Sequence, residues 1–356
     1  MGSMKRKRPD EPEKSFFRSK FEWVRGPMLG SGGFGSVYLA TVKKSKLGCE
    51  GFPTVMAVKT FSKSNELATE SSYLTLFRDC PFIIGSYGTN LTIGDDGHLK
   101  CNVFLEYADG GTIGDLIEKS GGSGLCESDV SKYTKAILKG LEYIHERGYV
   151  HCDLKPDNIL LVRSDSGFVP KIGDFGLAKM AMQKLSRQGT SMYFSPETVT
   201  HKIQEQPSDI WAVGCIVLGM LTGRQPWEVK GGADLKPLIA SKLPNVPGWL
   251  SEDAKDFLRK CLLRDPFKRS TAAELLKHSF VTKLDRVGEV EPVKEVASVS
   301  SPEQCDYGSF IPLGSWSSEE AVDFGPIPPV AVLNPRPVIP STACQKASNF
   351  AVMGAA

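Results

Sequence analysis

The sequence predicts an α+β protein of two lobes, in which a small lobe of β-strands precedes a larger, mainly helical lobe. Between residues 21 and 105, short β-branched segments bounded by glycine indicate strands, for example SVYLATV (36–42) and TVMAVKTF (54–61), with one helical stretch around residues 66–77. After residue 112 apolar side chains recur at the spacing of helices. This change of pattern favours two lobes with a cleft between them.

Two helices of the second lobe can be placed from the sequence. In the first, Ser128 is in position to cap the start and Gly148 to end the helix. Its apolar residues at helical spacing are Val130, Tyr133, Ile137, Leu141 and Ile144. The second, residues 210–221, is apolar on all sides but shorter than the roughly 18–20 residues that span a bilayer, so we expect a buried core helix.

The composition excludes several classes of protein. The chain has 356 residues, 41% of them hydrophobic and 24% charged, which is ordinary for a globular protein with a core. Because the formal net charge is only +2, we expect neither a nucleic-acid partner nor a membrane partner. The Lys/Arg-rich N-terminal stretch has no apolar run behind it and is unlike a secretory signal. Nine cysteines, without a CxxC pair, favour reduced intracellular thiols over a disulfide framework.

Three zones follow from the composition along the chain. Residues 1–21 predict a flexible basic segment, and residues 22–281 predict the folded domain, with lobes at 22–105 and 106–281. Residues 282–356 are rich in Pro and Ser and predict a disordered tail, either a docking or regulatory segment or an inert one. The run KRKR (5–8) is either of the nuclear-import type or a solvated tail, so we expect a cytoplasmic or nuclear protein, or both.

A glycine-rich stretch, GSGGFGSV (30–37), follows the pattern GxGxxGxV. Glycine lets the backbone approach phosphates and adopt positive φ, but an ordinary hairpin loop can also have this composition. A dinucleotide-binding fold would continue into a helix, whereas here the strand-like VYLATV (37–42) follows. The sequence therefore favours a β-hairpin lid over the turn of a dinucleotide-binding fold.

Lys59 ends the apolar segment VMAVK (55–59), where burial of an unpaired ammonium group would be costly. It is either a surface lysine at the end of a strand or a cation that pairs with phosphates and a nearby carboxylate. Glu70, 11 residues further along in a helical stretch, is the preferred partner. Glu66 is the alternative, and the spacing alone leaves both open.

The segment HCDLKPDN (151–158) places an acid, a cation and an amide within eight residues. Asp153 can accept the proton of a substrate hydroxyl and hold its oxygen in line. Lys155 can neutralise a transferring phosphoryl group, and Asn158 can bind a metal ion. The alternative is a polar turn without chemistry, which becomes a poor explanation once the next motif is added.

Asp174 begins the motif DFG (174–176), 21 residues after Asp153 and behind the strand-like VPKIG (169–173). A carboxylate at the end of a strand suits Mg²⁺ that bridges phosphate oxygens. The order of glycine loop, strand lysine, HCDLKPDN and DFG resembles the eukaryotic protein kinases over nearly all of residues 22–281. The resemblance implies the bilobal protein-kinase fold, ATP and Mg²⁺ as cofactors, and phosphoryl transfer to a protein substrate.

The resemblance implies further positions. Ser195, Pro196 and Glu197 match the family's Ala-Pro-Glu, and Arg269 matches the arginine that pairs with the glutamate. The metal ligands would be Asn158 and Asp174. The ATP-binding positions, which include a gatekeeper and a hinge that holds adenine, would be Leu29, Gly30, Gly32, Gly35, Val37, Ala57, Lys59, Glu70, Leu105, Glu106 and Ala108.

Two segments resemble the serine/threonine class and one branch of it. Lys155 is typical of that class, and Thr190 in GTSMYFSPE (189–197) resembles a threonine that contacts the catalytic Asp and Lys. EWVRGPMLGSGGFGSVYLA (22–40) is similar to the MEKK-like MAP kinase kinase kinases, and VHCDLKPDNILLV (150–162) to plant members of that branch. The resemblance implies that the protein substrates are MAP kinase kinases, phosphorylated on activation-loop Ser or Thr.

One position departs from the family. Most kinases have arginine before the catalytic aspartate, where it pairs with an activation-loop phosphate, but this chain has Cys152. Lys179 is a candidate to replace part of that charge. We therefore expect activity to depend less on phosphorylation of the loop, whose candidate hydroxyls are Ser186, Thr190 and Ser191. A packing role for the Cys152 thiol is favoured over a redox role.

Two other functions fit the resemblance. A catalytically dead pseudokinase scaffold would have no chemical need of Lys59, Asp153, Asn158, Asp174 and the three glycines together. A small-molecule kinase would have no need of the Ser-Pro-Glu segment and long activation loop, which shape a peptide groove. The sequence therefore favours a protein serine/threonine kinase with Asp153 as its catalytic carboxylate.

Overall fold

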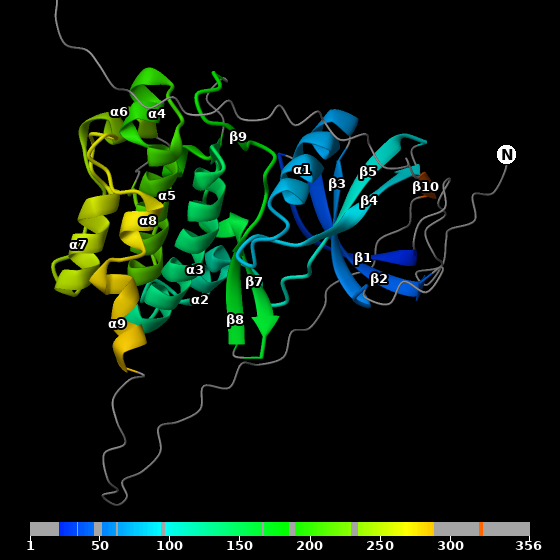
Figure 1. Cartoon of the computed structure of the whole chain (residues 1–356), viewed down its shortest axis with the longest axis horizontal. Coiled ribbons are helices and arrows are strands. Elements are labelled where there is room, and N and C mark those ends of the chain that lie inside the picture. Colours follow the sequence, from blue (N-terminus) through cyan, green and yellow to red (C-terminus); the bar gives the residue numbers. More distant parts are fainter. Residues whose placement is uncertain are drawn as a thin grey trace, which may run out of the picture. The chain divides into compact units, whose positions relative to one another are not determined.

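The computed structural model describes residues 21–33, 35–45, 52–61, 63–93, 97–165, 167–184, 189–228, 234–287 and 320–322. The basic run 5–8, the loop hydroxyl of Ser186 and most of the predicted tail lie outside these residues. Figure 1 shows the strands and the helix of residues 21–105 in blue and cyan, and the later, mainly helical part of the chain in green and yellow.

The first lobe is an antiparallel sheet with one helix. The sheet order is β1-β2-β3-β5-β4-β10, in which β10 (Glu320–Val322) comes from the C-terminal part of the chain. The central strands β3 and β5 are the most deeply buried. The helix α1 (Ser64–Leu76) buries Leu67, Glu70 and Leu74, so its inner face carries one carboxylate among apolar side chains. The strands are β1 (Phe21–Gly32), β2 (Gly35–Ser45), β3 (Val55–Phe61), β4 (Ser86–Ile93) and β5 (Leu99–Leu105).

The second lobe contains the remaining helices and two small sheets of two strands each. The short sheets pair β6 with β9 and β7 with β8. Their strands are β6 (Tyr149–Val150), β7 (Ile159–Ser164), β8 (Gly167–Ile172) and β9 (Lys179–Met180). The helices are α2 (Ile113–Lys119), α3 (Glu127–Glu146), α4 (Pro196–His201), α5 (Gln206–Thr222), α6 (Leu235–Ser241), α7 (Glu252–Cys261), α8 (Ala272–Leu275) and α9 (Ser279–Val287).

The helix α5 is the centre of this lobe. Every residue from Ser208 to Leu221 is buried, which confirms the prediction of a core helix at 210–221. Gly214 allows the close approach of α7, because a Cβ atom here would lie 2.7 Å from the Cβ of Cys261. Within the described part of the chain, the helices are too short or too polar to cross a membrane.

The start of α3 differs from the sequence prediction. Cys126 is the N-cap, with extended backbone, and Ser128 already lies inside the first turn. The predicted end is confirmed, since Gly148 follows the C-cap Arg147 with a φ of 78°, a left-handed conformation that glycine adopts without strain.

Two segments give structure to the predicted tail. The helix α9 continues to Val287, past the predicted domain end at residue 281. Glu320–Val322 form β10, which pairs antiparallel with β4. The prediction of a disordered tail does not hold for these residues, because β4 is an edge strand whose free backbone groups can accept a short partner.

Candidate active site

Lys59 connects three segments that are distant in the sequence. Its Nζ lies 2.6 Å from Oε2 of Glu70 on α1 and 2.7 Å from Oδ1 of Asp174 in the DFG motif. Glu70 is 1% exposed and Lys59 5%. The structure thus selects Glu70 over Glu66, which pairs at the surface with Lys63 at 3.3 Å.

The electrostatics of this cluster keep Lys59 charged and Asp174 ionised. Burial acts to lower the pKa of Lys59, but the charges of Glu70 and Asp174 outweigh it and raise that pKa above its usual value. Burial raises the pKa of Glu70 to about 7, against the opposing charge of Lys59. For Asp174, burial acts to raise the pKa, but Lys59 outweighs it, and the pKa lies below its usual value.

Asp153 is held in the loop between β6 and β7 by bonds at both carboxylate oxygens. Oδ1 accepts the backbone N–H of Thr190 at 2.8 Å. Oδ2 lies 3.3 Å from Nδ2 of Asn158, which also donates to the backbone carbonyl of Asp153 at 2.8 Å. Lys155 Nζ lies 3.4 Å from Asp153 Oδ2 and donates to Thr190 Oγ1 at 3.2 Å. The four side chains that the sequence singled out therefore lie together.

Asp209, the residue at the start of α5, positions this loop, a role that the sequence did not assign. Its carboxylate accepts the backbone N–H groups of His151 at 2.8 Å and Cys152 at 3.0 Å. It also lies 2.9 Å from Nε2 of His145. The signal in the sequence was a carboxylate in the first turn of an otherwise apolar helix, where buried acids require partners.

The glycine loop is the hairpin between β1 and β2, as predicted. Gly32 pairs with Gly35 and Gly30 with Val37 across it. Gly35 has a φ of 122°, and a Cβ atom there would collide with the backbone carbonyl of Thr60. Around Gly30 and Gly32 no atom lies within 4 Å of the Cβ position, so these two glycines leave open space.

The predicted adenine-binding positions lie on neighbouring strands and the following segment. Ala57 on β3 pairs directly with Leu105 on β5, and both are buried. The carboxylate of Glu106 accepts Lys171 Nζ at 2.8 Å through each oxygen, and the N–H of Gly85 at 3.1 Å. Because its side chain is used in this way, Glu106 braces the hinge to β8. Ala108 is partly buried, Val37 packs against the core, and Leu29 is 46% exposed.

The donor groups of Asn158 and Asp174 fit Mg²⁺. Asn158 uses its amide nitrogen to hold Asp153, so its oxygen remains to face a ligand. Asp174 has a lowered pKa and is an ionised oxygen donor. Among the described residues, no group of three or more His, Cys, Asp or Glu side chains could hold a metal by itself. Mg²⁺ commonly uses one or two protein ligands together with phosphates and water, and Asn158 and Asp174 would be two such ligands.

The scaffold pair Glu197 and Arg269 is confirmed. Arg269 donates through Nη1 to Oε1 of Glu197 at 2.7 Å and through Nη2 to Oε2 at 3.0 Å. Both residues are buried. This two-pronged pair fixes the end of the activation segment against the second lobe.

Two of the predicted activation-loop hydroxyls, those of Thr190 and Ser191, lie in different environments. Thr190 is bound to Lys155, while Ser191 is exposed in the turn η2 (Ser191–Tyr193). Lys179, considered as a replacement for the missing arginine, is already paired with Glu205 at 2.7 Å.

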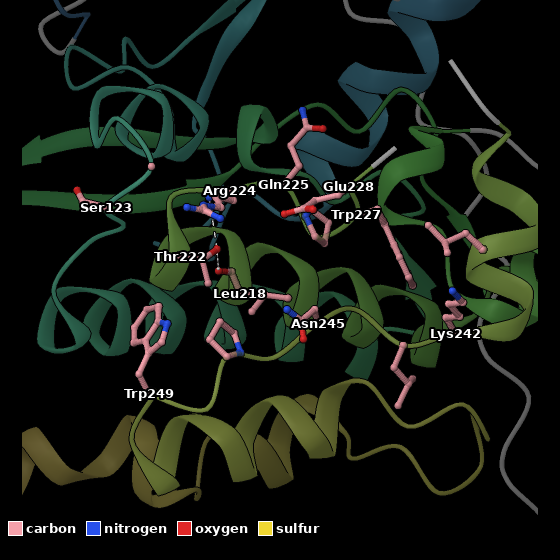
Figure 2. Close-up of a pocket in the computed structure, with 15 residues that line it drawn as sticks. Ser123, Leu218, Thr222, Arg224, Gln225, Trp227, Glu228, Lys242, Asn245 and Trp249 are labelled. Atoms are coloured by element: carbon pink, nitrogen blue, oxygen red, sulfur yellow. Dashed lines mark hydrogen bonds between the residues drawn. The ribbon is translucent and has the colours of Figure 1, made fainter. Parts of the chain in front are cut away.

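A separate cavity of about 350 Å³ lies in the helical lobe and contains none of the predicted site residues. Figure 2 shows Trp227, Arg224 and Lys242 on its walls and Trp249 at its edge. Trp249 is 69% exposed. This cavity therefore does not belong to the catalytic cluster.

Comparison with known proteins agrees with the geometry. Residues 23–281 match the family described as protein kinase domain, so the chain belongs to the protein kinase family. It is 41% identical over 275 residues to mitogen-activated protein kinase kinase kinase 20 of Arabidopsis thaliana. The matched region covers 73% of this chain and 78% of the relative. This chain is 38% identical to mitogen-activated protein kinase kinase kinase 17 of the same plant, with 76% and 72% covered. The chain is accordingly a protein serine/threonine kinase with relatives among plant MAP kinase kinase kinases.

Proposed function

We propose that this kinase is a MAP kinase kinase kinase, which uses Mg²⁺ and ATP to phosphorylate Ser or Thr in the activation loop of MAP kinase kinases. The cluster of Lys59, Glu70 and Asp174 carries the catalytic part of the proposal, because it assembles a phosphate-binding cation with its anchors. The similarity to two Arabidopsis MAP kinase kinase kinases supports the choice of substrate class.

The chain's own residues divide the work of phosphoryl transfer. Lys59, fixed by Glu70, would hold the phosphates of the nucleotide, and Asn158 and Asp174 would hold Mg²⁺, which neutralises phosphate charge. Asp153 would orient the acceptor hydroxyl and take its proton, while Lys155 would neutralise charge on the transferring group. Because Thr190 contacts both Asp153 and Lys155, it would fix the positions of these two side chains relative to each other. Catalysis then rests on positioning and electrostatics.

The proposal is tested by transfer of labelled γ-phosphate from Mg-ATP. The acceptors are a generic basic protein and a catalytically dead MAP kinase kinase, and phosphoamino acids are analysed afterwards. We expect transfer to Ser or Thr, strong preference for the MAP kinase kinase, and loss of transfer in Asp153→Asn. The matched control is Asp165→Asn, an exposed aspartate in the turn between β7 and β8, which should keep wild-type activity.

Two outcomes would contradict the proposal. Transfer to both acceptors at equal efficiency would remove the support for the substrate class. ATP binding without transfer by wild type would favour the pseudokinase scaffold. A scaffold of this kind would have no chemical need of the Lys59 cluster.

A further inference from the structure

Glu205 holds the start of the activation segment through two of its residues. Its Oε1 lies 2.7 Å from Nζ of Lys179 on β9, and its Oε2 accepts the backbone N–H of Met182 at 3.0 Å. Glu205 is also the N-cap of α5, where it forms a capping box with Ser208. One carboxylate therefore ties the activation segment to the central helix of the lobe.

The two partners of Glu205 both require such an anchor. Lys179 is only 4% exposed, and a buried ammonium group without a counter-charge is unfavourable. Met182 has a φ of 64°, a left-handed conformation that non-glycine residues keep only when neighbouring groups hold them in place. Met182 as a whole is 84% exposed, so packing of its side chain cannot supply the restraint.

This ion pair lies beside Cys152, the position where arginine would bind a loop phosphate. The strand β9 pairs with β6 through Lys179 and Val150, and Val150 is two residues before Cys152. Gln204, the neighbour of Glu205, donates to the carbonyl of Cys152 at 3.2 Å. Burial, with the charge of Asp209, raises the pKa of the Cys152 thiol, so the thiol stays neutral and does not compete for Lys179.

We propose that Glu205 is a positioning residue that supplies, from within the fold, the negative charge that a phosphorylated loop supplies in other kinases. It fixes residues 179–182 at one end of the segment, as the bond from Thr190 to Asp153 fixes the other end. The peptide groove is consequently formed without phosphorylation. This inference rests on the proposed kinase function.

The test compares Glu205→Gln with Glu205→Asp, which keeps the carboxylate, in the full chain. The matched control is Glu252→Gln. Glu252 also lies at the N-terminal end of a helix and pairs with a lysine, Lys255, at 2.9 Å, but it is exposed. The readouts are kcat and KM for the basic protein and for ATP, amide hydrogen exchange of residues 179–184, and the thermal midpoint. Each protein is assayed with and without phosphatase treatment.

We expect wild type and Glu252→Gln to stay active after phosphatase treatment. For Glu205→Gln, kcat/KM for the protein acceptor should fall by about ten-fold or more, KM for ATP should stay within about two-fold, and residues 179–184 should exchange faster. Glu205→Asp should recover part of the loss, because the charge is retained.

Three results would overturn the inference. The first is unchanged activity and unchanged amide hydrogen exchange in Glu205→Gln. The second is an equal loss of activity in Glu205→Gln and Glu205→Asp that follows a fall of the thermal midpoint. The third is inactivation of wild type by phosphatase. If wild type transfers no phosphate at all, the proposed function fails instead. The hydrogen-exchange comparison still decides whether Glu205 holds the segment.

Discussion

At the scale of residues, a single buried lysine organises the candidate active site. Lys59 forms ion pairs with two carboxylates, and each comes from a different element. Removal of the cation leaves Glu70 and Asp174 buried or partly buried without their partner, and it removes the group proposed to bind phosphate. Both stability and activity should respond, but to different degrees.

Lys59→Met should lower phosphoryl transfer by at least about a hundred-fold, because positioning of the phosphates contributes several kcal/mol to the rate. Transfer of labelled phosphate and the thermal midpoint measure the two effects. Lys63→Met is the control, since Lys63 pairs with Glu66 at the exposed start of α1. Equal activities of the two variants would refute the role assigned to Lys59.

Glu197→Gln should destabilise the protein by about 3–5 kcal/mol near neutral pH, because Arg269 is left buried without its counter-charge. Burial acts to raise the pKa of Glu197, but Arg269 outweighs it and lowers that pKa below its ordinary value of 4.5. The stabilisation is therefore present above the unfolded-state pKa and is lost as the pH falls through the lower folded-state pKa. Urea unfolding of both proteins at several pH values measures the difference, which should shrink below about pH 4.5. A difference that grows on acidification would contradict the assignment.

The sequence singled out most of the side chains of the candidate site because their motifs are contiguous. It could not choose between Glu66 and Glu70, since residues four apart lie on the same side of a helix and only packing under the sheet separates them. It also left Asp209 and Glu205 without roles. Their partners are backbone groups and a lysine far away in the sequence, and such contacts cannot be predicted from the spacing of residues along the chain.

At the scale of elements, the hairpin of β1 and β2 contains glycines of two kinds. Gly35 is required by its own backbone conformation and by the nearby carbonyl of Thr60. Gly30 and Gly32 face open space, so no contact within the protein requires glycine there. Their lack of a side chain leaves room for a ligand under the hairpin. Alanine substitution should therefore affect stability at Gly35 and nucleotide binding at Gly30 and Gly32.

Gly35→Ala should lower the free energy of unfolding by about 1–3 kcal/mol, because alanine is strained at this φ. Gly30→Ala and Gly32→Ala should leave the thermal midpoint unchanged but raise KM for ATP, because a methyl group would occupy the space next to the nucleotide. Thermal unfolding and steady-state kinetics distinguish the cases. A loss of stability in Gly32→Ala equal to that in Gly35→Ala would contradict the distinction.

The longer elements were predictable from periodicity, as in α3, or from a continuous apolar run, as in α5. The strands β6, β9 and β10 were not, because two or three residues are too few to show an alternation. Their positions are fixed by the partner strand, which is a property of the fold and not of the local sequence.

At the scale of the whole molecule, we expect a chain that ends at residue 287 to fold and to remain an active kinase. The three residues of β10 contribute hydrogen bonds of about 0.5–1.5 kcal/mol each, and ordering their backbone costs about 1–2 kcal/mol per residue, so the net effect is small. The thermal midpoint should change by no more than about 2 °C. Transfer activity and thermal unfolding test this, with the full chain as the control. A large loss of either would show that the tail is part of the folded domain.

If nucleotide and Mg²⁺ bind at the proposed positions, the contact between Lys59 and Asp174 also links the binding of these two ligands. A metal ion that approaches Asp174 meets a carboxylate that already neutralises an ammonium group, whereas a phosphate that approaches Lys59 draws that ammonium away. Each ligand therefore makes room for the other, and by thermodynamic reciprocity each raises the affinity of the other by the same factor. Nucleotide and metal should consequently bind with positive cooperativity, and Mg²⁺ alone should bind weakly.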